Sequence, residues 1–288
     1  MLRGYLELLR PANVVTAIAD VLAGYAVAGR ANHRALPWLL IATVCLYAGG
    51  VVLNDFFDRG LDAVERPERP IPSGRVPAHR AAALGAALMA SGVAAAGRAT
   101  WAAAVIAAVI ASLVLLYDVR GKRHAIAGPV NMGLCRGFNV VLGIAAVPAA
   151  LAAGWPIAVL SVIYIAAVTT VSRGEVHGGK TGAATFALVS LGVVLIALTT
   201  LAMSADTSAR IAALGLTAAL GFRVLPPFWQ VSKDPRPEVV RRAVKTGVLS
   251  LALVDATIGT AYAGPVYGAA VLATALAAGW LARVFSVT

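Results

Sequence analysis

Ten stretches of this chain are apolar over about 20 consecutive residues, the length that an α-helix needs to cross a bilayer. The expected spans are residues 12–29, 36–57, 78–97, 101–117, 128–153, 156–172, 182–203, 209–229, 240–263 and 266–285. The last two are less regular, because Asp255 interrupts one and the other follows a short Gly264-Pro265 turn. The sequence therefore predicts an all-α protein, a polytopic transmembrane bundle of nine or ten helices in a single domain over residues 1–288.

The composition argues against the alternative, a soluble alanine-rich helical protein. Hydrophobic residues make up 60% of the chain and charged residues only 13%, whereas soluble domains carry about 25% charged residues. So little polar surface cannot cover a soluble domain of this size. The two cysteines, Cys45 and Cys135, lie inside predicted spans and are expected to pack there, without a disulfide framework.

The basic residues gather on one side of the predicted bundle. A net charge of +11 alone is compatible with nucleic-acid binding, but no nucleic-acid motif is present. The N-terminal tail, the loops after even-numbered spans and the C-terminal tail carry 18 of the 24 Lys and Arg residues. By the positive-inside rule this side is cytoplasmic. We therefore expect an integral membrane protein of the bacterial inner-membrane type, with a cytoplasmic N-terminus, cytoplasmic catalytic loops and no nucleic-acid partner.

A cluster of acidic residues follows the second span, on the predicted cytoplasmic side. Residues 55–68 hold five of the 13 acidic residues of the chain. If the helix continues past residue 57, Asn54, Asp58 and Asp62 follow one another at four-residue intervals. Asp55 is then expected to share their face of the helix. Like charges at this spacing repel one another, so the sequence predicts a compensating partner.

Two explanations account for this acidic face. It is either a solvated helix end neutralised by Arg59, Arg66 and Arg69, or a site for Mg²⁺. Mg²⁺ is commonly held by one or two carboxylates together with substrate phosphates. A carboxylate face at the end of a membrane helix suits a substrate with a diphosphate head and an apolar tail. Ionisable residues at membrane depth are also functional candidates by default, and we therefore favour the Mg²⁺ site.

Residues 54–62 read NDFFDRGLD, which matches the NDxxDxxxD motif of the UbiA superfamily of intramembrane prenyltransferases. Residues 65–76, ERPERPIPSGRV, resemble the Arg-Pro-Ile/Leu-Pro-Ser-Gly string that follows the motif in that family. The resemblance implies a prenyl diphosphate donor, bound to Mg²⁺ that is held by Asn54, Asp55, Asp58 and Asp62. It also implies that two arginines contact the diphosphate or order the loop, Arg69 and Arg75.

The loop after the fourth span resembles the same superfamily less closely. Members often carry a Tyr followed by a Lys-Arg pair, and Tyr117, Lys122 and Arg123 are similar, with the spacing one residue longer. Lys122 and Arg123 are either a clamp that neutralises the departing diphosphate or charges that only set topology. Tyr117 is a candidate substrate contact or an ordinary interfacial aromatic residue.

Polar residues inside the spans are further candidates. Arg136 and Asn139 lie three residues apart on one face of the fifth span, and an unpaired arginine in a bilayer is costly. A role in the substrate pocket is favoured over an ion pair that serves only packing. Asp20 is expected near the cavity, and an ion pair with Arg223 is one possibility for Asp255.

After the sixth span the family places a second Asp-rich motif, but residues 171–182 read VSRGEVHGGKTG and contain no aspartate. Glu175 alone is a weak replacement for that motif as a second metal ligand. Alternatively, the positive charges of Arg173 and Lys180 take the place of the second cation. His177 is either a general base near neutral pH or a loop residue without a role. The string SRGEVHGG resembles the EboC-like branch of the superfamily. That resemblance points away from aromatic acceptors and makes a polyol or cyclitol acceptor plausible.

Together these features predict a bundle whose central cavity opens toward the cytoplasm and sideways toward lipid. In the expected reaction an allylic cation forms in a dry pocket and a small acceptor captures it, with Glu175 or His177 taking the proton. The donor is expected to be geranylgeranyl or farnesyl diphosphate. One alternative is a membrane terpene cyclase of the same fold, and another is a non-catalytic carrier or transporter component for prenyl diphosphate.

Overall fold

The computed structural model describes residues 2–121, 124–175 and 178–281, and every regular element in this part of the chain is a helix. Ten of these helices have 15 residues or more. They are α2 (Pro11–Val27), α3 (Leu36–Glu65), α4 (Ala78–Ala99), α5 (Trp101–Val119), α6 (Ala127–Ile144), α8 (Ala158–Ser172), α9 (Thr181–Met203), α10 (Thr207–Lys233), α11 (Pro237–Ala263) and α12 (Pro265–Leu281). The shorter ones are α1 (Leu2–Leu9) and α7 (Leu151–Gly154), the latter between the 3₁₀ turns Pro148–Ala150 and Trp155–Ile157.

The predicted spans are largely confirmed, with two kinds of difference. In the described part of the chain, seven helical segments are long and apolar enough to cross a membrane, and α2, α6 and α12 are shorter or more polar. The prediction of one helix over 128–153 was wrong, because α6 ends at Ile144. Pro148 has no backbone N–H and would leave the carbonyl oxygen of Ile144 without a helical partner, which favours the end of the helix before it. In the other direction, α3 continues to Glu65 as one 30-residue helix.

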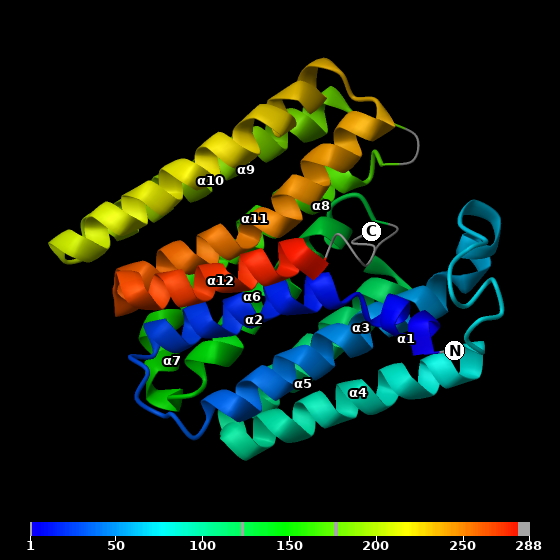
Figure 1. Cartoon of the computed structure of the whole chain (residues 1–288), viewed down its shortest axis with the longest axis horizontal. Helices are drawn as coiled ribbons and strands as arrows, with labels where there is room; N and C mark the ends of the chain where they lie inside the picture. The colour runs from blue at the N-terminus through cyan, green and yellow to red at the C-terminus, as the bar shows by residue number, and fades with distance from the viewer. Residues whose placement is uncertain (1, 122–123, 176–177, 282–288) are drawn as a thin grey trace.

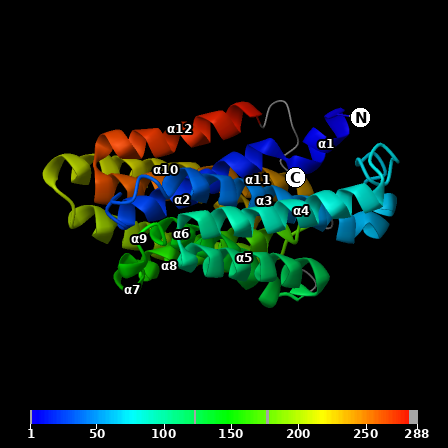
Figure 2. The same ribbon diagram turned by 90° about the horizontal axis from the view of Figure 1, so that it is seen from below.

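The first long helix, α2, lies at the centre of the bundle. It packs against α3, α6, α11 and α12. Figure 1 shows α4 and α5 on one flank and α9 and α10 on the other, with α2, α11 and α12 between them. Seen from the side, α12 and α2 lie above α5, α6 and α8 (Figure 2). This arrangement leaves α2, α3, α5, α6, α8 and α11 around a shared interior space.

Glycines allow α2 and α6 to cross at close range. A Cβ atom on Gly143 of α6 would lie 2.2 Å from the carbonyl oxygen of Val21 in α2. A Cβ atom on Gly24 of α2 would lie 1.9 Å from the carbonyl oxygen of Val140 in α6. Small residues at helix interfaces are a common way for membrane helices to approach one another closely. The crossing therefore depends on the absence of a side chain at both positions.

The segment after α3 folds back over the end of that helix. Ile71 and Val76 in this segment join Leu8 of α1 and Val52 of α3 in a small buried apolar cluster. Gly74 has a φ of 75°, a left-handed conformation that glycine adopts without steric cost. Residues 66–77, which we call the α3–α4 loop, are therefore anchored between α1 and α3.

Substitution Gly143→Ala is expected to destabilise the bundle, because the new methyl group meets backbone atoms that belong to another helix. Overpacking of this kind costs about 1–3 kcal/mol. Gly192→Ala in α9 is the matched control, since a Cβ atom there meets nothing within 4 Å. Thermal unfolding in detergent should show a lower Tm for Gly143→Ala and an unchanged or higher Tm for Gly192→Ala. Equal Tm values for the two variants would contradict the close α2–α6 crossing.

Candidate active site

A cavity of about 480 Å³ lies inside the bundle. Its walls come from α2, α3, α5, α6, α8 and α11, with contributions from the linker before α2 and from the loops after α3 and α8. Polar and charged side chains line one end, which we call the outer polar end. It is formed by Arg10, Asn54, Asp58, Asp62, Glu65, Arg66, Arg69, Asp118 and Glu175. The middle of the cavity is apolar, with Leu46, Ile110, Val114, Val168 and Leu251 among its lining.

The acidic face of α3 divides between the cavity and the protein. Asn54, Asp58 and Asp62 line the cavity, but Asp55 is buried and does not line it. Arg10, in the linker before α2, donates a hydrogen bond to Oδ1 of Asp55. With about 100° of rotation per residue, Asn54 and Asp55 lie about 100° apart around the helix. The expectation that all four side chains share one face of the helix was therefore wrong for Asp55, which points into the protein and not into the cavity.

Arg69 of the α3–α4 loop compensates the buried carboxylates. Its Nη1 atom donates to Oδ2 of Asp62 at 2.8 Å and lies 3.4 Å from Oδ1 of Asp55. Arg75 does not reach the cavity lining. It donates instead to Oε2 of Glu7 at 2.6 Å and to the carbonyl oxygen of Glu68 at 2.6 Å. Of its two predicted roles, the ordering of the loop is the one that this position allows.

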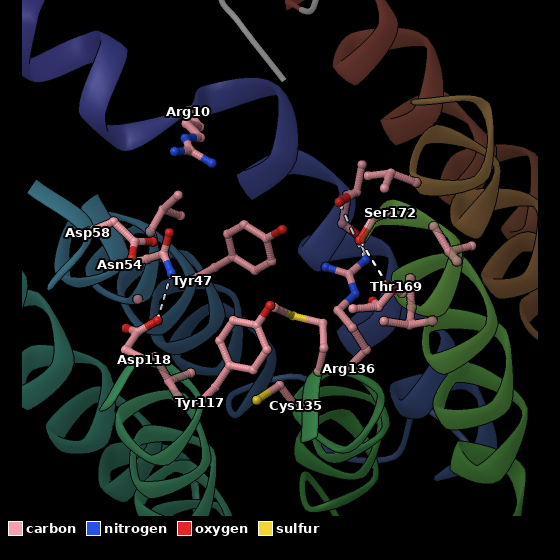
Figure 3. A pocket seen from close by; sticks show the side chains of 18 of the residues that line it. Arg10, Tyr47, Asn54, Asp58, Tyr117, Asp118, Cys135, Arg136, Thr169 and Ser172 are labelled. Atoms are coloured by element: carbon pink, nitrogen blue, oxygen red, sulfur yellow. Dashed lines mark hydrogen bonds between the residues drawn. The ribbon is translucent and has the colours of Figure 1, made fainter. Parts of the chain in front are cut away.

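Asp118 is a site residue that the sequence prediction missed. This aspartate near the end of α5 is buried and lines the cavity, and its Oδ1 accepts a hydrogen bond of 2.8 Å from Nδ2 of Asn54. Figure 3 shows the pair together with Asp58 at one side of the pocket. Because the amide nitrogen of Asn54 is engaged, its carbonyl oxygen is available as an acceptor. The available signal in the sequence was an aspartate at the end of a span on the predicted cytoplasmic side, since the same reasoning had already selected the acidic residues of α3.

Tyr117, also on α5, lines the cavity. In Figure 3 the rings of Tyr117 and Tyr47 lie between the outer polar end and Arg136. Tyr47, a further residue missed by the prediction, belongs to α3 and lines the same cavity. Aromatic faces carry negative electrostatic potential and attract cations. The two rings therefore give the apolar middle of the cavity a surface that favours positive charge.

Only some of the residues predicted as site residues in the loop after α8 line the cavity. Glu175 lines it, whereas Arg173 and Lys180 do not, and Arg173 Nη1 donates to the carbonyl oxygen of His124 at 3.1 Å. Burial raises the pKa of the Glu175 carboxyl, and the positive charges of Arg66 and Arg241 oppose that rise. Three further predicted residues lie outside the described residues, namely Lys122, Arg123 and His177.

At the opposite end the cavity reaches what we call the inner polar wall, formed by Thr16, Thr43, Arg136 and Asn139. Arg136 Nε lies 3.1 Å from Oδ2 of Asp20, so Arg136 both lines the pocket and forms an internal ion pair. Asp20 itself is fully buried and does not line the cavity. The suggested pairing of Asp255 with Arg223 was wrong, because Arg223 Nε donates to Oγ of Ser250 at 2.9 Å.

The outer polar end has the ligand chemistry for a hard divalent cation that arrives with its own oxygen atoms. Within the described part of the chain, no three His, Cys, Asp or Glu side chains are close enough to hold a metal ion by themselves. The cavity does present one amide oxygen and two carboxylates, from Asn54, Asp58 and Asp62. Mg²⁺ is commonly held by one or two carboxylates plus substrate phosphates. The donor set therefore fits Mg²⁺ in the presence of a phosphorylated ligand.

The sequence pattern of the UbiA prenyltransferase family matches residues 17–287. Among individual relatives, digeranylgeranylglyceryl phosphate synthase of Methanothermobacter thermautotrophicus is 28% identical over 139 residues, which cover 48% of this chain and 49% of that protein. The enzyme of the same name from Methanopyrus kandleri is 51% identical over 77 residues, 26% of this chain and 28% of that protein. The matches thus span about half or less of the length of these relatives.

A solved structure with the same fold is that of a UbiA homologue from Archaeoglobus fulgidus bound to DMAPP and Mg²⁺. It superimposes with a TM-score of 0.65 at 16% sequence identity, over 94% of this chain and 99% of that one. The likeness extends over nearly the whole described bundle, and at this identity it concerns the fold.

Glu175→Gln is expected to stabilise the protein near neutral pH. The raised pKa means that the folded state disfavours the charged carboxylate, so this carboxylate destabilises the fold at pH values above the folded-state pKa. The destabilisation fades as the pH falls toward the ordinary value of 4.5, where the carboxyl is protonated. Thermal unfolding should show a higher Tm for Glu175→Gln at pH 7.5, and the gap should narrow at pH 4.5. Glu65→Gln, at an exposed position of the same cavity, controls for the loss of a charge. A Tm gap that widens on acidification would be inconsistent with the raised pKa.

Proposed function

The chain belongs to the UbiA prenyltransferase family, and from that premise we propose that it transfers an isoprenyl group from a prenyl diphosphate to a small acceptor inside the membrane. The observation that carries the proposal is the form of the cavity. Carboxylates and arginines gather at one end, and an apolar section bordered by two tyrosines follows directly. A diphosphate head fits the first part, and an isoprenyl tail fits the second.

The outer polar end would bind the diphosphate together with Mg²⁺, the ion bound with DMAPP in the Archaeoglobus fulgidus homologue. Asn54, Asp58 and Asp62 would hold the ion, and Asp118 would keep the Asn54 amide oriented through its hydrogen bond. Asp55, predicted from the motif as a further ligand, would act on the site by holding Arg10 and Arg69 in place. The ion supplies positive charge against the phosphate oxygens.

Three arginines at the outer polar end provide the remaining positive charge. Arg10, Arg66 and Arg69 line the cavity within the described structure, whereas Arg75, Arg173 and Lys180 lie away from it. We propose that the first three contact the diphosphate. Preorganised positive groups are most effective where negative charge develops in the transition state, which here is the departing diphosphate. Lys122 and Arg123 remain predictions for the same role.

In the proposed step, the bond between C1 of the isoprenyl group and the diphosphate oxygen breaks, and both electrons leave with the diphosphate. The allylic cation that remains lies beside the faces of Tyr47 and Tyr117, where cation–π attraction stabilises it. An acceptor oxygen then forms the new C–O bond and gives up its proton. Glu175 is the described base at this end of the cavity, since its raised pKa favours proton uptake. His177 stays the alternative base from the sequence.

Several finer features belong to the same proposal. The donor would be geranylgeranyl or farnesyl diphosphate, and the acceptor a non-aromatic polyol or cyclitol, in line with the resemblance of residues 172–179 to the EboC-like branch. Residues 1–288 would act as one domain in a membrane of the bacterial inner-membrane type. The outer polar end would face the cytoplasm, because the loops there carry most of the basic residues.

Asp58→Asn tests this function most simply. In lipid nanodiscs with Mg²⁺ and geranylgeranyl diphosphate, we expect diphosphate release by the wild type and a loss of about 100-fold or more in the variant, because a carboxylate at the metal is removed. The control is Asp234→Asn, which removes the charge of a partly exposed aspartate paired with Arg236 on the same basic side.

The products separate the proposal from its alternatives. A prenylated acceptor supports the transferase, whereas a hydrocarbon or alcohol without an acceptor atom indicates a cyclase. Tight donor binding without diphosphate release, under every acceptor mixture supplied, would refute the enzyme and favour a carrier.

A further inference from the structure

The inner polar wall lies well away from the proposed metal site. Tyr47 and Thr43 precede Asn54 in α3 by seven and eleven residues. At a rise of 1.5 Å per residue, Tyr47, which contacts Arg136 of the wall, lies about 10 Å below Asn54, and Thr43 of the wall lies about 16 Å below it. Apolar side chains line much of the cavity between the two polar ends. The wall therefore needs an explanation other than contact with the diphosphate.

The side chains of the wall are held rigidly in one arrangement. Asn139 Nδ2 donates to Oδ2 of Asp20 at 2.9 Å, and its Oδ1 accepts a 2.8 Å hydrogen bond from Oγ1 of Thr43. Arg136 Nη2 donates to the carbonyl oxygen of Thr16 at 3.2 Å. Helices α2, α3 and α6 each contribute to this network, so the positions of its donors are fixed by the packing of the bundle.

One donor of this network lacks a hydrogen-bond partner. Arg136 has only 6% of its surface exposed, and its Nη1 has no hydrogen-bond partner among the described residues. An unsatisfied buried donor costs about 1–3 kcal/mol, and more when the group is charged. Because Arg136 lines the cavity beside Tyr47, its guanidinium is the group of this network that an oxygen atom of a bound molecule would meet.

The net charge around Arg136 determines whether a neutral hydroxyl or an anionic phosphate oxygen is favoured as its partner. The carboxyl of Asp255 in α11 faces that of Asp20 within hydrogen-bonding reach, and both residues have 0% of their surface exposed. Apart from this contact between the two carboxyls, no N–H or O–H group of the described chain donates to either oxygen of Asp255. Two carboxyls thus accompany one guanidinium, and even with a proton shared between the carboxyls no positive charge is left over. A buried anion needs such a surplus.

We infer that the inner polar wall binds uncharged hydroxyl groups of the acceptor and discriminates against phosphorylated acceptors. The inference rests on the proposed function, since it names the acceptor class of the same site. A small polyol can direct one hydroxyl toward the isoprenyl C1 while another reaches Arg136. The expected acceptor therefore differs from that of relatives named for a glyceryl phosphate product.

The test uses the full chain in nanodiscs with Mg²⁺ and radiolabelled geranylgeranyl diphosphate. Two matched acceptor pairs serve as probes, myo-inositol with myo-inositol 1-phosphate and glycerol with glycerol 1-phosphate. The wild type should favour the uncharged member of at least one pair by about tenfold or more in kcat/KM. Asp20→Asn leaves the guanidinium less compensated, so it should shift this ratio about tenfold or more toward the phosphorylated member, with the KM for the donor unchanged.

If the Asp20→Asn variant does not fold, a second variant tests the same inference. Arg136→Gln should raise the KM for the uncharged acceptor about tenfold, again without a change in the KM for the donor. Arg223→Gln is the matched control, since Arg223 is a span arginine that pairs with Ser250 and does not line the cavity.

Three results overturn the inference. They are a wild type that prefers phosphorylated acceptors, donor turnover with neither member of any pair prenylated, and an acceptor preference unaffected by both variants. Absence of diphosphate release with every acceptor is a different result, because it refutes the proposed function and the inference falls with it.

Discussion

The bridge from Arg69 to Asp55 and Asp62 is the contact on which the outer half of the structure depends. Helix α3 extends beyond the length needed to cross a bilayer and carries its carboxylates on the last turns. Without nearby positive charge these carboxylates would repel one another and weaken the helix end. Arg69 reaches them because the α3–α4 loop is held against α1 and α3 by its apolar cluster. The same compensation leaves Asn54 and Asp58 directed into the cavity.

The cavity combines two polar ends with different charge balance. Arginines and carboxylates of both signs meet at the outer polar end, where a dianionic or trianionic head and a divalent cation can be accommodated together. The inner polar wall has a single guanidinium that is already matched by buried carboxyls. In the proposed reaction, the apolar section and the two tyrosine rings between them would keep water away from a transient cation and stabilise it.

Much of this architecture could be predicted from the sequence, because it depends on local properties. Length and hydropathy located the helices, and four-residue spacing placed Asn54, Asp58 and Asp62 on one side of α3. Residues whose role depends on a distant partner were not predictable in this way. Arg10 became part of the site because α1 and α2 meet at that point, and Asp118 because α5 lies opposite Asn54. Asp255 pairs with Asp20 of α2 and not with Arg223, a choice that only the packing of α11 against α2 determines.

The central claim is that the side chains of α3 hold a divalent cation only together with a diphosphate. Mn²⁺, a spectroscopic substitute for Mg²⁺, tests this claim by electron paramagnetic resonance of the purified chain, with and without a non-cleavable geranylgeranyl thiolodiphosphate. The account predicts weak Mn²⁺ binding alone, tight binding with the analogue, and affinity about 10–100-fold lower in Asp118→Ala, which frees the Asn54 amide to rotate. Equal Mn²⁺ affinity with and without the analogue, or equal analogue binding in the absence of any divalent cation, would contradict it.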